Sequence, residues 1–574
     1  MSTPWDVIVV GAGAAGLVAA WHARQQGASV LVVNKGLVGR SGATITSGGG
    51  ISAAGSTLRA LGLDVDATDT EETFFHDTVR AGSFLNDQRL VEAMVTGVGD
   101  ELRRYIAAGV KFRVNKKAPG HSSGRGIHIS GPDMQKAVTD DALAAGVQFR
   151  EDFQSTALLT RDGAVVGVAG LDRRTGEAEA LHGHAVVIAT GGTTSNWHLR
   201  TAPEELSGEG HAMALDAGAS LIEMELLQFL PCCLAAPPIW RGLQFPWILG
   251  PQGGLRAWLL NRYGERFMAR WDPERMELAT RDVVSAACAA EVVEGRGSPS
   301  GAVYLSWKHL PDDILDHYPT WSKSVTPDWH WQGFDMKPLI ERIRADHAVE
   351  VMPAAHFSLG GIRVDGHGGT GVPGLFAAGE ATGAVHGANR LSGNAGAQVL
   401  VQGKRAGVAA ARDARERRAD GRADNLEQAF DAIHAPWRNA GRDGVVPYEL
   451  KDRLTQLAES TLGAARSGPA LEAALARLQA LARDELPRLA PRDTARVWNR
   501  DWSDALEVRA AVPVLESALR GALGRPASIG AHQRHDLRGV ASQGTLRHSI
   551  VRRSSDGDLS LTHEAVRHDL LQPA

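Results

Sequence analysis

Cysteine and long apolar runs are scarce in this sequence. Only three cysteines occur among 574 residues, namely Cys232, Cys233 and Cys288. Three thiolates cannot supply the usual four ligands of an iron–sulfur cluster, and no Cys-x-x-Cys-His segment is present for covalent haem. The sequence also has no run of about 18 apolar residues, which a membrane-spanning helix would need. We therefore expect no metal site and no transmembrane segment.

The chain also lacks an excess of positive charge. A net charge of −5 with 21 histidines gives no basic field for nucleic acid or a membrane surface. The hydrophobic share of 43% and the charged share of 22% are typical of globular proteins, and the length favours two or three domains. The first expected strand begins near residue 5, too early for a signal peptide to precede it, so a cytoplasmic location is expected.

A glycine-rich turn near the start predicts a dinucleotide site. Residues 5–16 read Trp-Asp-Val-Ile-Val-Val-Gly-Ala-Gly-Ala-Ala-Gly. An apolar strand, Val7–Val10, leads into Gly11, Gly13 and Gly16, and a helical stretch follows over Leu17–Gln25. Such glycines permit a tight turn and a close approach to a pyrophosphate at the helix N-terminus. A purely structural glycine turn is the alternative, but strand and helix provide the context that the motif needs.

A second segment, far along the chain, narrows the dinucleotide to FAD. Residues 374–380 read Gly-Leu-Phe-Ala-Ala-Gly-Glu, a late strand that ends in an acid. We expect Glu380 to meet the ribityl chain of the flavin. The second strand, Ser29–Val33, ends in Asn34-Lys35, where an acid usually binds a ribose hydroxyl. Asn34 can still bond a hydroxyl, and Lys35 can donate to a phosphate.

The Gly/Ser/Thr-rich loop over residues 39–51 is interpreted as backbone lying along the flavin. It contains Arg40 and leads directly into the small residues of Ser52–Gly55. A flexible linker would need neither feature, although a linker remains the alternative.

The rest of the chain predicts an α/β fold with two further parts. Residues 150–190 alternate in polarity with turns at Asp162-Gly163 and Thr175-Gly176, which indicates a β-meander. Residues 235–349 are rich in Trp and Pro and are expected to form an inserted cap. The dinucleotide domain resumes near Met352 and closes with a helix over Gln398–Arg412, followed by a solvated linker. Helices follow over 425–525, with leucines at helical spacing at Leu471, Leu475, Leu478 and Leu481, and a hairpin around Asp556-Gly557.

The expected architecture is thus an FAD-binding dinucleotide fold with an inserted α+β capping domain and a C-terminal helical domain. The predicted boundaries are 1–235 and 350–424 for the FAD-binding domain, 236–349 for the capping domain and 425–574 for the C-terminal domain.

Several segments in order resemble one flavoprotein family. They are Ser207-Gly-Glu-Gly-His-Ala-Met213, Arg262–Met268, Thr280-Arg-Asp-Val-Val284, Val303–Pro311, His356–Gly361, His386–Asn394 and Ala527–Asp536. Together they resemble the flavoproteins of succinate dehydrogenase, fumarate reductase and L-aspartate oxidase along nearly the whole chain. The helical C-terminal part favours this branch over the cytochrome-fused soluble fumarate reductases.

The resemblance implies roles for three residues. Arg281 matches the arginine that exchanges a proton with the substrate, on the face opposite the flavin. Arg390 and His356 match residues that bind a substrate carboxylate, and a guanidinium fork suits that group. The predicted FAD ligands are Gly11, Gly13, Ala14, Ala15, Gly16, Asn34, Lys35, Arg40, Ser41, Ser47, Gly48, Gly49, Gly191, Glu209, Glu380, Arg390, Ala395 and Gly396.

The sequence departs from the family in two places. The respiratory members carry a flavin-bonding His in an Arg-Ser-His-Thr segment, which here reads Arg40-Ser-Gly-Ala43, so FAD is expected to be non-covalent. The family's Gln-Phe-His-Pro-Thr becomes Gln228-Phe-Leu-Pro-Cys232, and its Thr-Glu-Gly becomes Gly250-Pro-Gln-Gly253. Leu230 replaces a His that grips a second carboxylate. We therefore expect a substrate less polar at that end than succinate or fumarate.

The sequence thus predicts an FAD-dependent oxidoreductase that moves a hydride to or from a C–C or C–N bond of a carboxylate-bearing small molecule. Electrons need an external donor or acceptor, for which a separate iron–sulfur protein is one option. The alternatives are the flavoprotein component of a succinate dehydrogenase or fumarate reductase complex, an aspartate-oxidase-like enzyme, and a flavin-binding scaffold that has lost catalysis.

Overall fold

The computed structural model divides the chain into two compact units. It describes residues 4–114, 117–244, 256–311, 330–331, 334–335, 337–417, 422–537, 546–554 and 556–573. The first unit comprises residues 1–198, 202–227 and 357–574, and the second comprises residues 199–201 and 228–356. The predicted cap, residues 236–349, falls within the second unit. The further division of the first unit into an FAD-binding and a C-terminal domain stays a prediction.

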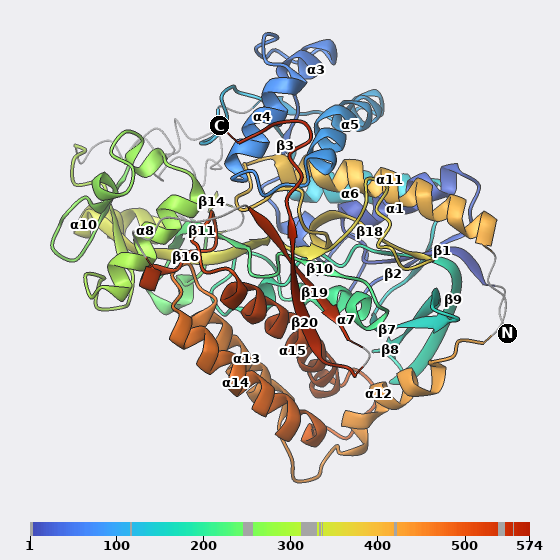
Figure 1. Ribbon diagram of the computed structural model, residues 1–574. Helices are drawn as coiled ribbons and strands as arrows, with labels where there is room; N and C mark the ends of the chain where they lie inside the picture. The colour runs from blue at the N-terminus through green and yellow to red at the C-terminus, as the bar shows by residue number, and fades with distance from the viewer. Residues whose placement is uncertain are drawn as a thin grey trace. The chain divides into compact units, whose positions relative to one another are not determined.

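A parallel sheet forms the centre of the first unit (Figure 1). Its strand order is β6-β2-β1-β9, and β18 also pairs with β9 in parallel. Val7, Ile8 and Val9 of β1 are fully buried, as expected of a strand covered on both faces. The bounds are β1 Trp5–Val10, β2 Val30–Val33, β6 Gln148–Arg150, β9 Glu177–Ile188 and β18 Leu375–Ala377.

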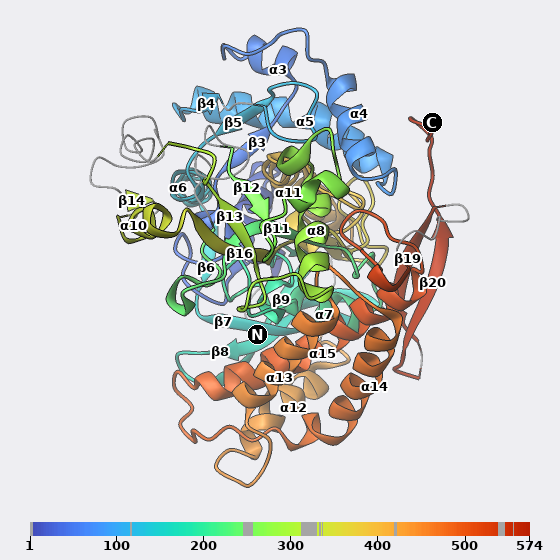
Figure 2. The same cartoon turned by 90° about the vertical axis from the view of Figure 1, so that its left-hand side faces the viewer.

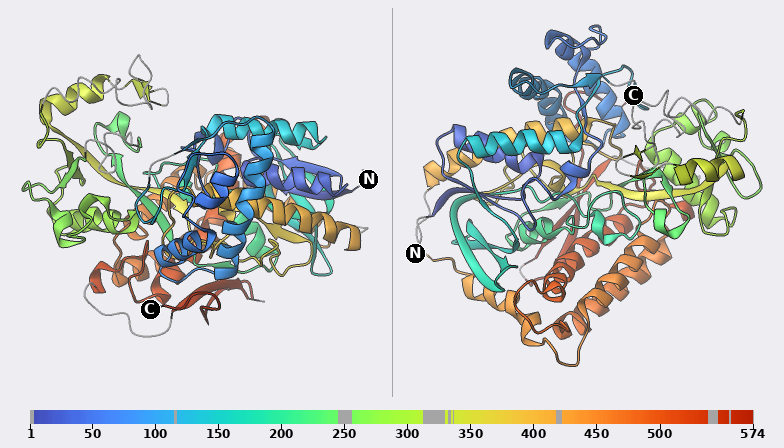
Figure 3. Two further views of the ribbon diagram at one scale, coloured as in Figure 1. Left: turned by 90° about the horizontal axis from the view of Figure 1, so that it is seen from above. Right: turned by 180° about the vertical axis from the view of Figure 1, so that it is seen from behind.

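The predicted β-meander is confirmed. β7 (Phe153–Arg161), β8 (Ala164–Asp172) and β9 pair antiparallel in sequence order, and Asp162-Gly163 turns between the first two. The predicted hairpin is also confirmed, because β19 (Arg547–Arg553) and β20 (Leu559–Ala565) pair across Asp556-Gly557. Figure 3 shows this hairpin in dark red.

Helices α1 (Ala14–Gln25) and α11 (Asn394–Arg417) pack side by side beside the parallel sheet (Figures 1 and 3). Helix α11 is longer at both ends than the expected stretch from Gln398 to Arg412. Its first turn starts directly after the loop that carries Arg390, and Arg417 at its end donates to the carbonyl of His184. The residues that directly follow Arg412 were expected to lie in a linker, but as far as Arg417 they belong to α11.

The remaining elements of the first unit are mostly helical. Helices α13, α14 and α15 lie side by side (Figure 2), with Leu471, Leu478 and Leu481 of α14 buried as the leucine spacing predicts. The bounds of the remaining helices and strands of the first unit are α2 Ala43–Thr46, β3 Gly50–Ser52, α3 Gly55–Ala60, α4 Glu71–Ala81, α5 Gln88–Ala107, β4 Arg113–Val114, β5 Gly126–His128, α6 Gly131–Ala144, α7 Glu209–Asp216, β10 Leu221–Ile222, β17 Gly361–Ile362, α12 Leu426–Arg438, α13 Pro447–Thr461, α14 Gly468–Asp484 and α15 Arg500–Gly524.

The second unit is built on an antiparallel sheet of order β11-β16-β13-β12. Its core includes Leu234, Phe267, Cys288, Trp307 and Val351. The elements are β11 Leu227–Leu234, β12 Trp258–Leu260, α8 Arg281–Val293, β13 Val303–Ser306, β14 His330–Trp331, β15 Phe334–Asp335, α10 Lys337–Asp346 and β16 Ala348–Ser358. Among the helices in the described ranges, none is long and apolar enough to cross a membrane.

Candidate functional site

The glycine turn after β1 has the close packing that its sequence predicts. A Cβ atom on Gly11 would lie 2.3 Å from the carbonyl oxygen of Ala189, and one on Gly16 would lie 2.0 Å from that of Gly11. Only glycine lets β1, α1 and the end of β9 approach so closely. Helix α1 begins with Gly13 as its N-cap and has no side-chain cap there. The N–H of Ala14 in the first turn donates to the hydroxyl of Thr44 at 2.9 Å, so the next N–H groups, those of Ala15 and Gly16, are the ones that suit a pyrophosphate.

Asn34 at the end of β2 supports this turn. Its Oδ1 accepts a hydrogen bond from the N–H of Ala12 at 3.1 Å. Its Nδ2 donates to the carbonyl of Gly36 and to the hydroxyl of Ser41, both at 3.0 Å. Because both amide hydrogens are used within the protein, Asn34 can meet a ribose hydroxyl only as an acceptor.

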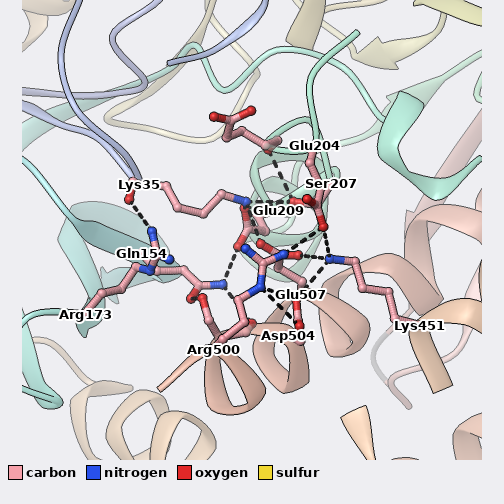
Figure 4. Close-up of polar contacts among 12 residues, drawn as sticks. Lys35, Gln154, Arg173, Glu204, Ser207, Glu209, Lys451, Arg500, Asp504 and Glu507 are labelled. Carbon is pink, nitrogen blue, oxygen red and sulfur yellow. Dashed lines mark hydrogen bonds and ion pairs between the residues drawn. The ribbon is translucent and has the colours of Figure 1, made fainter. Parts of the chain in front are cut away.

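Lys35 has a different role from the one expected. Its ammonium donates to Ser207 at 3.1 Å, to Glu209 at 2.7 Å and to Glu507 at 3.0 Å (Figure 4). An ammonium has three N–H donors, so none is left for a phosphate in this arrangement. Burial lowers the pKa of Lys35, but the carboxylates of Glu209 and Glu507 outweigh burial and raise it above its ordinary value. Lys35 is therefore a charged anchor for Glu209.

Glu209 begins helix α7 and is held from two sides. Its Oε2 accepts from Lys35 and from Ser207, and its Oε1 accepts from Gln154 Nε2 at 2.7 Å. A carboxylate oxygen can accept a second hydrogen bond, so Glu209 keeps the capacity to receive a hydroxyl.

The other predicted FAD ligands of the first unit differ in exposure. Arg40, Ser47 and Gly48 are exposed, and a Cβ on Gly48 would meet no atom within 4 Å. Gly191 follows β9, whereas Ala395 and Gly396 open α11, where a Cβ on Gly396 would lie 2.4 Å from the carbonyl oxygen of Gly50. Gly396 therefore serves the packing of α11 against β3.

Glu380 is a half-buried acid in the turn that follows β18. Burial raises the pKa of Glu380 to about 7, although the N–H of Ser358, donating at 3.0 Å, and the charge of Arg390 oppose the shift. The guanidinium of Arg390 lies 4.4 Å from the ring centroid of Phe357. Glu380 can therefore exchange a proton near neutral pH and act as either donor or acceptor.

These features fit FAD at the carboxyl ends of the parallel strands, where such folds bind dinucleotides. The N–H groups of Ala15 and Gly16 at the start of α1 suit a phosphate, and Glu209 can still accept a hydroxyl. The hydroxyl oxygen of Thr190, just after β9, is buried without a hydrogen-bond partner in the part of the chain that the structure describes. Such an orphaned group calls for a ligand or water.

Arg281 in the second unit is a half-buried cation whose hydrogen-bond partner is a neutral amide. It begins helix α8, and its NH1 donates to the side-chain oxygen of Gln228 at 3.1 Å. Within the described residues it makes no ion pair with an acid. Burial lowers the pKa of Arg281 to about 10. This site can attract an anion and brings the guanidinium nearer to proton exchange than an exposed one.

The second unit also contains His356 and Leu230. His356 Nδ1 lies 2.7 Å from the hydroxyl of Thr201, which fixes the orientation of the ring. Leu230 on β11 packs against Leu199, Cys233 and Ala354. Of the three residues expected to act on substrate, Arg281 and His356 lie in this unit and Arg390 lies in the first. Gln252, in the altered cap segment, lies outside the described residues.

Several polar residues were missed by sequence reasoning. Gln228 and Thr201 contact Arg281 and His356, and each is distant from its partner in sequence. The acidic and basic residues around Lys35 were missed too, since they come from helices that the sequence assigns only to packing. These are Lys451, Arg500, Asp504 and Glu507. Gln228 could have been found from the sequence, because it lies in the segment Gln228-Phe-Leu-Pro-Cys232, which the family resemblance places at the substrate.

Comparison with known proteins identifies the family of the chain. The family model described as FAD binding domain matches residues 6–395, and the model described as fumarate reductase flavoprotein C-term matches residues 451–574. The chain is 34% identical over 543 residues to a subunit of the CoM/CoB fumarate reductase of Methanothermobacter marburgensis, covering 93% of this chain and 94% of the relative. It is 31% identical over 579 residues to the L-aspartate oxidase of Streptomyces coelicolor, covering 97% and 93%.

A solved structure is similar over the full length. The quinol fumarate reductase of E. coli matches with a TM-score of 0.85 at 27% identity, covering 100% of this chain and 98% of the other. The chain therefore belongs to the flavoprotein family of fumarate reductase, succinate dehydrogenase and L-aspartate oxidase, and it is an FAD-dependent oxidoreductase.

Proposed function

We propose that the protein moves a hydride between FAD and a C–C or C–N bond beside a carboxylate in a small molecule. FAD, when bound, supplies the hydride donor or acceptor at the N5 atom of the flavin. The observation that carries this proposal is the half-buried Arg281, which has a neutral amide and no carboxylate as its partner among the described residues.

Partial burial of the Arg281 guanidinium without a counter-charge among the described residues is unfavourable, so the site favours an anion. A substrate carboxylate, or negative charge that develops on the substrate during the reaction, would supply that counter-charge. The lowered pKa of Arg281 supports a second role, in which the guanidinium gives a proton to the substrate carbon and regains it from another group.

A role in binding a substrate carboxylate is proposed for His356 in the second unit, and the same role is proposed for Arg390 in the first. The contact between Thr201 and His356 Nδ1 supports this role, since a fixed ring presents its other nitrogen in one direction. Arg390 is 7% exposed and stacks on Phe357, which holds a planar fork suited to bidentate binding.

The substrate is proposed to be neither succinate nor fumarate. Leu230 cannot donate a hydrogen bond, and it packs in an apolar cluster with Leu199 and Cys233. The neighbouring Cys232 offers little more, because burial raises the pKa of its thiol to about 12 and keeps it neutral. An unpaired carboxylate would be costly here. A ligand with one carboxylate and a less polar second end fits better.

The electron partner is proposed to be a separate molecule. Three cysteines cannot form a four-thiolate cluster in this chain. The related protein of Methanothermobacter marburgensis is named as one component of a larger enzyme, which supports a partner protein as one form of this arrangement. A neighbouring gene for an iron–sulfur protein, followed by co-purification of the two products, would test this.

The hydride-transfer proposal is tested by reoxidation of the reduced flavin. The holoprotein is reduced without oxygen and mixed with a panel of unsaturated acids while flavin absorbance is followed. We expect reoxidation by an acid with one carboxylate and a less polar second end, and slow reaction with fumarate. Fast reoxidation by fumarate would return the substrate to the C4 dicarboxylates. If no unsaturated acid reoxidises the reduced flavin, and no matching saturated acid reduces the oxidised flavin, the protein is better explained as a flavin-binding scaffold that has lost catalysis.

A further inference from the structure

Glu507 bridges two lysines in the interior of the first unit. Its Oε1 accepts from Lys35 at 3.0 Å and its Oε2 accepts from Lys451 at 2.6 Å (Figure 4). The side chain of Glu507 is 7% exposed. Burial alone would raise its pKa, but the two ammonium groups outweigh burial and hold it well below its ordinary range. Glu507 is therefore a fixed anion on α15.

The network continues to the C-terminal helices on one side. Lys451 of α13 also donates to Asp504 of α15 at 3.0 Å, and Arg500 donates to Asp504 and to Glu204. A buried carboxylate between two cationic partners resists displacement, because moving it would remove one anionic partner from each lysine. Glu507 is thus supported by both α13 and α15.

The other side of the network reaches the glycine turn. Lys35 directly follows Asn34, whose side chain bonds the N–H of Ala12 between the glycines. In dinucleotide folds, an acid at the end of the second strand binds the adenosine ribose. Here that strand ends in Asn34, and the acid held beside it is Glu209, which starts α7 and is bonded to Lys35.

We propose that Glu507 is a positioning residue for FAD: it fixes Lys35 and, through Lys35, the Glu209 carboxylate that binds the adenosine end of the cofactor. The C-terminal helices then contribute to cofactor affinity without touching the cofactor. The inference rests on Glu209 as an FAD ligand, which the experiment tests separately.

The test compares FAD dissociation constants of holoproteins, measured from the fluorescence of released FAD on dilution. Glu507→Gln keeps the shape of the side chain but removes its charge. We expect FAD affinity to fall about tenfold, the size of one lost charge-assisted hydrogen bond. Glu209→Gln should weaken FAD at least as much. The double variant should be no weaker than Glu209→Gln alone, because Glu507 acts through Glu209.

Glu485→Gln is the matched control, since Glu485 pairs with Arg453 in the same helical region but outside this network. It should leave FAD affinity unchanged. Glu507→Asp keeps the charge on a shorter side chain, and its FAD affinity should lie between those of the wild type and Glu507→Gln. If Glu507→Gln does not fold, Glu507→Asp takes its place in the test. Unchanged affinity in Glu507→Gln, additive losses in the double variant, or an equal loss in Glu485→Gln would each overturn the positioning role. If Glu209→Gln binds FAD as tightly as the wild type, Glu209 is not an FAD ligand and the positioning role of Glu507 fails with it. FAD binding by the family fold would be unaffected by that result.

Discussion

At the scale of single residues, Arg281 has the most specific environment. It is a half-buried cation that donates to the amide of Gln228, and no local feature of Ala279-Thr280-Arg281-Asp282 predicts this contact. The resemblance assigned the residue, but its lack of an acidic partner among the described residues is a property of the folded unit. We therefore expect catalysis to depend on both the shape and the proton affinity of the group at position 281.

Arg281→Lys is predicted to lower turnover by at least ~100-fold, because an ammonium differs from a guanidinium in geometry and in proton affinity. FAD content should stay near that of the wild type. The measurement is flavin reoxidation with the best acid of the panel. Arg275→Lys, at an exposed position of the same unit, is the control. Turnover within a few-fold of the wild type would remove Arg281 from the mechanism.

Leu230 carries the prediction on substrate size and polarity. Malonate, succinate and fumarate should bind weakly, with dissociation constants near ~1 mM at best, because Leu230 leaves a buried carboxylate unpaired. Leu230→His should bind malonate more tightly. Both proteins are titrated with malonate while flavin absorbance is recorded. Micromolar binding by the wild type would mean that another residue supplies the second contact.

At the scale of elements, His532 joins three segments of the first unit. Its Nδ1 accepts from Arg466 NH1 at 3.0 Å, since a guanidinium can only donate. The ring proton is therefore on Nε2, which donates to the carbonyl of Arg525 at 2.9 Å. Arg466 also donates to the carbonyl of Glu225 at 2.7 Å. The junction requires a neutral imidazole, because protonation of Nδ1 would remove the lone pair of His532 that accepts from Arg466.

This junction predicts a pH dependence of stability. Burial and the charges of Arg466 and Arg525 lower the pKa of His532 well below 6.5. The unfolded chain takes up a proton below about pH 6.5 while the folded chain does not. The free energy of unfolding should therefore fall with decreasing pH, by up to ~1.4 kcal/mol per pH unit from this group.

Urea unfolding between neutral pH and about pH 5 measures this slope. His532→Gln should be less stable at neutral pH but show a shallower slope, because one titrating group is gone. His367→Gln, at an exposed position, serves as the control. The prediction fails if His532→Gln and the wild type have the same slope. The buried His121, His211 and His386, whose pKa values burial also lowers, contribute to the slope in both proteins.

At the scale of the whole molecule, the protein is expected to hold FAD without a covalent bond. No histidine occurs between Lys35 and His76, the segment in which the family resemblance implies that a flavin-bonding His would lie. Acid precipitation of the yellow protein should release all of its flavin as free FAD. Absorbance of supernatant and pellet measures this, and flavin that stays with the pellet would contradict it.

The sequence by itself determined the elements whose signal is local. Apolar residues from Val7 to Val10, followed by glycines, predicted β1, its turn and α1, because strand, turn and helix each follow from neighbouring side chains. Asp556-Gly557 predicted the hairpin of β19 and β20 for the same reason. Glu380 was placed after a buried strand, where β18 ends. The resemblance to the flavoprotein family was likewise readable from ordered motifs.

Only the tertiary structure decided the partners of the charged residues. Lys35 was expected to donate to phosphate, yet its three donors go to acceptors 172, 174 and 472 residues away. The amide hydrogens of Asn34 are likewise used within the protein. A lysine side chain follows no periodic pattern that predicts its partner, because the energy of a buried ion pair depends on distance and desolvation after folding. The network from Lys35 to Lys451, and the contact of Arg281 with a neutral amide, therefore arise only from the folded chain.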